Sequence, residues 1–167
     1  MDGRSLATLT ICTSILFAQQ IVLQGIPNIE LVSILIIVYT LAFRRKVLYI
    51  IYVFVLLQGL YYGFSLWWWL PYLYVWTILA FITWLFRSCR SPLIWAVISG
   101  IFGLSFGALC SIPHLIIGGP AFALSYWISG IPFSIVHCIG NFVICLVLWR
   151  PLIKIFAKFP GTYISLD

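Results

Sequence analysis

The sequence predicts an all-α membrane protein: a single domain, residues 1–167, folded as a compact bundle of six transmembrane helices with cytoplasmic N- and C-termini. Three observations predict this fold. Apolar residues make up 64% of the chain and charged residues 7%, whereas a soluble domain carries about 25% charged residues. The apolar residues form stretches long enough to cross a bilayer. The nine Lys and Arg residues all lie in alternate connections or at the ends.

A helix needs about 20 mostly apolar residues to cross the hydrocarbon core of a bilayer, and six stretches approach that length. In chain order they are Leu6–Leu23, Pro27–Phe43, Val47–Phe64, Leu66–Phe86, Leu93–Ile112 and Phe133–Trp149. The first follows Arg4 but has no small-residue cleavage site, so we expect a helix there rather than a signal peptide. No segment alternates apolar and polar residues as the strands of a membrane barrel do.

The start of the sixth helix needs a separate argument, because the last apolar stretch, Ala121–Trp149, is too long for one simple helix. Gly130 and Pro132 interrupt this stretch, and both residues disfavour a helix interior. We therefore expect the sixth span to begin at Phe133. The residues before it are expected to form an outer loop with a short helix, and a role as a lid stays open.

The basic residues predict the orientation of the bundle. They are Arg4, Arg44, Arg45, Lys46, Arg87, Arg90, Arg150, Lys154 and Lys158. They lie before the first span, after the second, after the fourth and after the sixth, and the other three connections contain none. Cytoplasmic connections carry the excess of Lys and Arg, so both termini are expected inside. The net charge of +6 is therefore an orientation signal, and no nucleic-acid partner is expected because no polar face clusters the basic residues.

Polar residues within or beside the spans are the candidates for a binding site. Glu30 is the only acid near the membrane on the outer side, where a carboxylate needs a partner, water or a ligand. A role at the helix start, which Asn28 could cap, and a ligand contact both stay open. His137 and Asn141 are four residues apart and share a helix face. They are expected to form either a helix–helix hydrogen bond or a ligand contact.

Two strips of small residues predict close helix packing. The fifth span carries one at every fourth position: Ser99, Gly103, Gly107 and Ser111. Its partner is expected to be another span of the same chain. The first span carries a weaker strip: Ala7, Thr10, Ser14 and Ala18. This strip is expected to pack either inside the bundle or against another membrane protein.

Several motifs of catalysis are absent from the sequence. It contains no GxxxxGK[ST] phosphate loop and no HExxH or GxSxG motif. The five cysteines form no CxxC pair and no zinc-site spacing, so we expect no metal site. Transport is therefore favoured over catalysis. A stand-alone secondary transporter or channel is one alternative, and a membrane enzyme that uses His114 or His137 is a less favoured one.

Residues 130–152 resemble the last helix of the substrate-binding S components of energy-coupling factor (ECF) vitamin transporters. In that family this region often reads G-I-P-F-D-x-x-H-x-x-x-N, followed by an apolar run and a basic-Pro-Leu end. The matching residues are Gly130, Ile131, Pro132, Phe133, His137, Asn141, Arg150, Pro151 and Leu152. Ser134 stands where the family usually has an acid. The segments 27–33 and 118–120 are also similar to such proteins.

The resemblance implies a substrate-capture (S) subunit of an ECF-type ABC importer in a prokaryotic plasma membrane. Such a subunit binds a vitamin or related small heterocyclic micronutrient at the extracellular face. It works with a membrane T protein and two cytoplasmic ATPases, so the chain itself would hold no cofactor and use no ATP. By position, the implied substrate site comprises Asn28, Glu30, Tyr126, Trp127 and His137, and we add Asn141.

The same resemblance implies a docking face for the T protein on the first helix, where the family has an A-x-x-x-A strip. The nearest equivalent in this chain is Ser14 and Ala18, within the wider strip that starts at Ala7.

Overall fold

The computed structural model describes residues 3–26, 29–159 and 161–164, and every regular element among them is a helix. In chain order the elements are α1 (Gly3–Val22), α2 (Val32–Phe43), the 3₁₀ helix η1 (Arg44–Lys46), α3 (Val47–Tyr62), α4 (Trp69–Leu85), α5 (Pro92–Cys110) and α6 (Ile112–Phe156). No strand occurs in these ranges, which confirms the all-α prediction.

Three of the helices, α1, α5 and α6, are long and apolar enough to cross a membrane. Each directs large apolar side chains outward; for example, Ile11 is 58% exposed, Ile101 58% and Val147 65%. A soluble monomer rarely exposes contiguous apolar surface of this kind. Helix length, composition and outward-facing apolar side chains together indicate a membrane protein.

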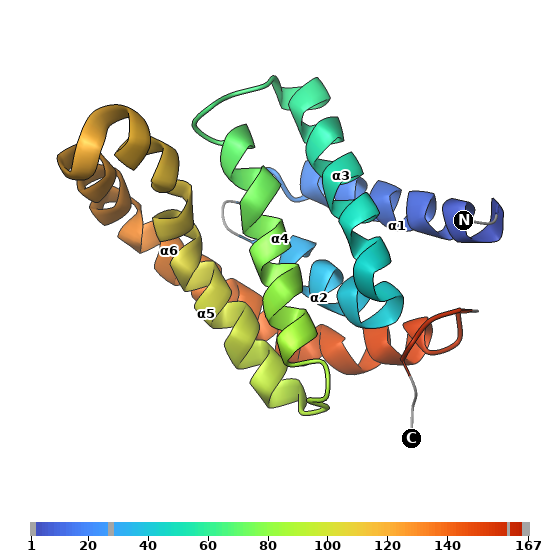
Figure 1. The fold of residues 1–167 in the computed structure, drawn as a ribbon. Helices are drawn as coiled ribbons and strands as arrows, with labels where there is room; N and C mark the ends of the chain where they lie inside the picture. Colours follow the sequence, from blue (N-terminus) through green and yellow to red (C-terminus); the bar gives the residue numbers. More distant parts are fainter. Residues whose placement is uncertain (1–2, 27–28, 160, 165–167) are drawn as a thin grey trace.

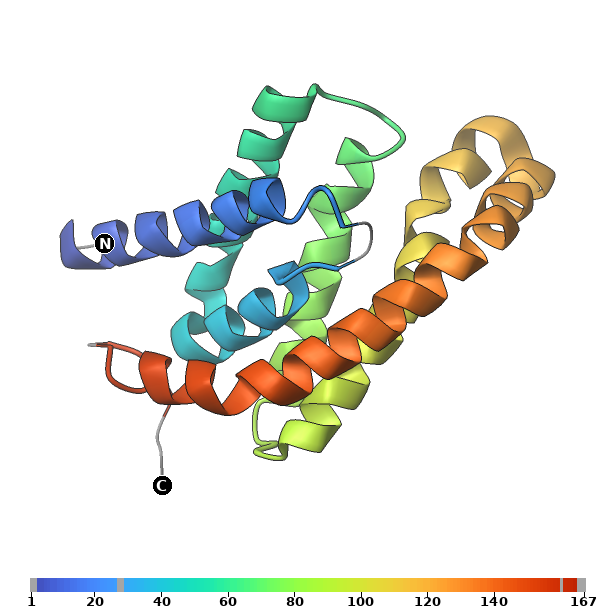
Figure 2. The same cartoon turned by 180° about the vertical axis from the view of Figure 1, so that it is seen from behind.

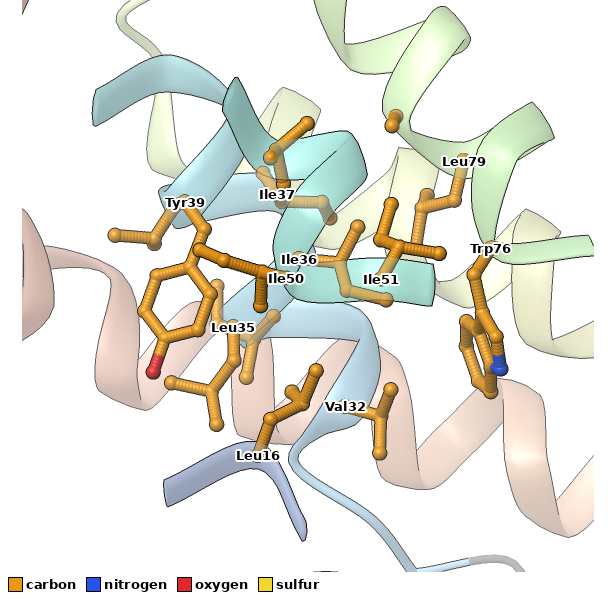
Figure 3. Close-up of a cluster of buried hydrophobic side chains, with 14 of the residues drawn as sticks. Leu16, Val32, Leu35, Ile36, Ile37, Tyr39, Ile50, Ile51, Trp76 and Leu79 are labelled. Carbon is orange, nitrogen blue, oxygen red and sulfur yellow. The ribbon is translucent and has the colours of Figure 1, made fainter. Parts of the chain in front are cut away.

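Helix α2 lies at the centre of the bundle, between α1, α3, α4 and α6 (Figures 1 and 2). All of its residues except Leu41 are buried. Figure 3 shows Leu16 of α1, Ile50 of α3 and Leu79 of α4 packed around it. A helix that is apolar on every face is suited to such a position, so the protein builds its core around its shortest α-helix.

The second span was predicted from Pro27 to Phe43, but α2 begins only at Val32, and residues 29–31 are not helical. The physical reason lies in Glu30, whose carboxylate accepts a hydrogen bond of 2.8 Å from the backbone N–H of Ser33. This bond satisfies one of the N–H groups that a helix start leaves without an intrahelical partner. The helix is therefore capped at this point, and its 12 residues extend about 18 Å.

The predicted start of the last helix at Phe133 is wrong, and the segment before it, predicted as an outer loop with a short helix, is helical on both sides of Gly119. The chain is helical over Ile112–Phe156, with one break at Gly119, where φ is 78° and ψ is −179°. Glycine adopts a positive φ without steric cost, and the following Pro120 has a φ suited to a first helical turn. Pro132 lies inside the helix without ending it, as proline often does in membrane helices.

The connections that follow α2 lie at two ends of the bundle (Figures 1 and 2). One end carries η1, the α4–α5 connection and the last turns of α6, and the other carries the α3–α4 connection and the turn between α5 and α6. The basic residues of η1 and of the α4–α5 connection therefore share one end of the molecule.

Candidate functional site

A buried polar cluster joins the start of α2 to the middle of α6. The Glu30 carboxylate lies 3.3 Å from Nε2 of His137, and the Ser33 hydroxyl donates a hydrogen bond to the same carboxylate. The Asn141 amide donates to the Ser33 hydroxyl oxygen at 3.0 Å and to the Ser99 carbonyl at 3.4 Å. The structure therefore brings together three of the predicted site residues, Glu30, His137 and Asn141.

The glycines of α5 determine how closely α6 approaches this cluster. A Cβ atom on Gly103 would lie 2.8 Å from the backbone oxygen of His137, and one on Gly107 would lie 2.8 Å from the Ser134 hydroxyl. Real Cβ atoms essentially never make contacts this short. The small-residue strip of α5 therefore packs against another helix of the same chain, as predicted, and holds His137 in place.

A cavity of about 410 Å³ opens beside Glu30 and His137, within the range of roughly 300–1,000 Å³ that is typical of small-molecule sites. Besides this pair it is lined by Gln20, Leu23, Gln24, Ile26, Ile29, Tyr62, Tyr72, Trp76 and Phe106. The Tyr62 hydroxyl donates a hydrogen bond of 2.9 Å to the Gln24 side-chain oxygen. This contact ties α3 to the chain that follows α1 at the edge of the cavity.

The aromatic side chains of the cavity form a continuous wall that ends at the imidazole. Ring centroids are 5.5 Å apart for Tyr72 and Trp76, 5.5 Å for Trp76 and Phe106, and 5.1 Å for Phe106 and His137. The Trp76 indole N–H is buried and has no hydrogen-bond partner in the described structure. A buried donor without a partner is costly, and the Trp76 residue that carries it lines the cavity.

Two other predicted site residues, Tyr126 and Trp127, lie away from this cavity. Tyr126 stacks on His114 at the end of the bundle where α5 meets α6, with ring centroids 3.9 Å apart. Trp67 and Phe122 also contact His114, at 4.7 Å and 5.0 Å. Trp127 is 42% exposed. The structure therefore does not place these two side chains with Glu30 and His137, and Asn28 lies outside the described residues.

The predicted docking residues share one face of α1. Ala7, Ser14 and Ala18 are exposed, whereas Leu9 and Leu16 on the opposite face are buried in the core. The strip of small residues therefore faces outward from this chain.

Sequence reasoning did not assign Ser33, Trp76 or Phe106 to the site. A weak signal exists for two of them. Ser33 follows Glu30 at a spacing of three, as a cap contact requires, and Trp76 follows Tyr72 at a spacing of four, which places both on one helix face. Phe106 offers no such signal, because only the packing of α4 against α5 and α6 brings it to the cavity.

Within the part of the chain that the structure describes, no group of three or more His, Cys, Asp or Glu side chains is arranged to hold a metal ion. The five cysteines are all free. Comparisons of the chain with models of protein families, with curated proteins and with solved structures find no match.

Proposed function

We propose that this protein is the substrate-capture (S) subunit of an ECF-type importer. It would bind a vitamin or related small heterocycle at the extracellular face and release it inward with a membrane T protein and two cytoplasmic ATPases. The observation that carries this proposal is the cavity of about 410 Å³, whose aromatic wall meets the Glu30–His137 pair. The resemblance of residues 130–152 supplies the class of transporter, and it includes His137 and Asn141.

The proposal includes six membrane crossings with both termini in the cytoplasm. Besides the three long helices, α3 has 16 residues and α4 has 17, which corresponds to about 25 Å each. Helix α2 is shorter than the hydrocarbon core is thick, but it is enclosed by other helices. Non-helical backbone is tolerated at membrane depth where it is buried in protein or lines a cavity, and residues 29 and 30 line this one.

The side chains of the cavity favour a flat, nitrogen-containing ring as the substrate. The rings of Tyr72, Trp76 and Phe106 offer stacking surface, and aromatic pairs prefer centroid distances of about 4.5–7 Å. The Glu30 carboxylate accepts hydrogen bonds from an amine or ring N–H, and the unpartnered Trp76 N–H donates to an acceptor on the ligand. Small-molecule sites usually orient their ligand with a few placed polar groups, and Gln20 and Gln24 add to those of this cavity.

The T protein would dock on the outward face of α1. Small side chains such as Ala7, Ser14 and Ala18 allow a second helix to approach at backbone distance. The exposure of all three leaves this face free for such a contact. The chain carries no phosphate loop, so ATP would be hydrolysed only by the partner subunits.

The first experiment identifies the substrate. We expect native mass spectrometry of the purified protein to show one copurifying small heterocycle, whose affinity is then measured by isothermal titration calorimetry. Glu30→Gln keeps the shape of the side chain but removes its charge, and a hydrogen bond to a charged group is worth about 1.5–3 kcal/mol. The dissociation constant should therefore rise at least about tenfold. Ser129→Ala is the matched control, because Ser129 is exposed and does not line the cavity.

Two results would contradict the proposal. Unchanged affinity in both Glu30→Gln and Trp76→Phe would show that this cavity is not the binding site. Uptake of the copurifying compound into vesicles that contain this chain alone, without ATP, would favour a stand-alone secondary transporter over an S subunit.

A further inference from the structure

A second cleft lies at the end of the bundle that carries η1 and the α4–α5 connection. Its volume is about 440 Å³, and three arginines line it: Arg44, Arg87 and Arg90. Arg44 belongs to η1, whereas Arg87 and Arg90 follow α4. Ser88 and Trp149 also line the cleft. Residues far apart in the sequence thus bring three arginines to the lining of one cleft.

No acidic side chain in the described part of the chain offsets this positive charge. Glu30 is the only acid within it, since the other two, Asp2 and Asp167, lie outside. Glu30 is paired with His137 in the first cavity. Like charges around one cleft with low-dielectric walls produce a focused positive potential. An anion entering the cleft would therefore relieve their mutual repulsion.

Two of the arginines are oriented by aromatic rings instead of extending freely into solvent. The Arg44 guanidinium carbon lies 3.9 Å from the ring centroid of Tyr163, and that of Arg87 lies 4.9 Å from Trp84. Tyr163 is held in turn by a hydrogen bond of 3.0 Å from its backbone N–H to the Ala42 carbonyl. Arg44 also has a φ of 51°, which non-glycine residues rarely adopt and which recurs at ligand clamps.

We propose that this cleft binds a phosphate group, either the phosphodiester of an anionic lipid headgroup or a soluble phosphate. The planar guanidinium group matches phosphate oxygens with two parallel hydrogen bonds, so a set of oriented arginines favours phosphate over simpler anions. Basic pockets between membrane helices are a known setting for anionic headgroups. The proposal is independent of the substrate cavity, which lies beside different residues.

The test uses the full chain in phosphatidylcholine nanodiscs and has two arms. In the first, phosphatidylglycerol is added in steps, and native mass spectrometry measures how much of it the protein retains relative to phosphatidylcholine. In the second, inorganic phosphate is titrated by calorimetry. The double variant Arg87→Gln/Arg90→Gln should weaken binding at least about tenfold. The control Lys154→Gln/Lys158→Gln removes the same charge from α6 and the residues after it, at positions that do not line the cleft.

Ser88→Glu is a second variant, which places a carboxylate among the arginines and should abolish binding. Circular dichroism and the thermal midpoint establish that each variant is folded. Cleft-dependent retention of phosphatidylglycerol supports the lipid headgroup, and cleft-dependent binding of phosphate alone supports a soluble ligand. The proposal is overturned if the protein binds neither phosphatidylglycerol nor phosphate preferentially, or if the cleft and control variants lose binding equally.

Discussion

Replacing Gly103 by alanine is expected to separate α5 from α6 and to destabilise the protein. The new methyl carbon would lie 2.8 Å from the His137 backbone oxygen, whereas ordinary contacts begin at 3.4 Å. Helix α6 would therefore have to move by about 0.6 Å, because a backbone atom cannot rotate away as a side chain does. Overpacking of this kind lowers the free energy of unfolding by about 1–3 kcal/mol. The better helix propensity of alanine offsets about 0.5–1 kcal/mol of this loss.

The assay compares thermal unfolding in detergent for Gly103→Ala and the control Gly130→Ala. Gly130 also lies in a helix, but a Cβ atom there would meet nothing within 4 Å. At about 2–4 °C per kcal/mol for a chain of this size, the midpoint should fall by several degrees for Gly103→Ala. It should stay the same or rise slightly for the control. A midpoint for Gly103→Ala equal to or above that of the control would refute the close α5–α6 contact.

Three further predictions follow from other contacts. Asn141→Leu should lower stability by about 1–3 kcal/mol in chemical denaturation, because it removes the donor to the Ser33 hydroxyl inside the bundle. Trp76→Phe should weaken substrate binding by calorimetry and also lower the unfolding midpoint, because Trp76 is 2% exposed and the smaller ring leaves a void beside Phe54 and Phe102. Ala18→Trp should prevent copurification of a T protein without changing substrate affinity, since Ala18 is exposed on α1; retained copurification would exclude that face.

The helices could be predicted from hydropathy, and the predicted bounds of α3 and α5 lie within two residues of those observed. The starts of α2 and of the last helix could not be predicted in this way. A run of apolar residues predicts that a segment is removed from water, and this signal is equally clear for α2 and for α5. Whether such a segment begins one turn later depends on a local hydrogen bond, as at Glu30, or on one residue with positive φ, as at Gly119. Pro132 misled the prediction because proline ends helices in water more reliably than in a packed or lipid-facing helix.

The candidate site was predicted in part, for a related reason. The spacing of His137 and Asn141 places both on one face of a helix, and the scarcity of acids drew attention to Glu30. These are local signals in the sequence. The aromatic wall depends on how α4, α5 and α6 are arranged around the cavity, and no spacing within one helix encodes that. Tyr126 and Trp127 were assigned to the site by their position in the sequence, yet neither residue lines the cavity.

The late start of α2 links the fold to the proposed function. Had residues 29–31 continued the helix, they would have added about 4.5 Å of it in the region that the cavity now occupies, since Ile29 and Glu30 line that cavity. The Glu30 carboxylate would then have lain on a helix surface instead of capping the first turn and meeting His137. The same carboxylate therefore caps the first turn of α2 and provides the only acidic group that lines the cavity. Glu30→Gln should for this reason reduce both substrate affinity and stability.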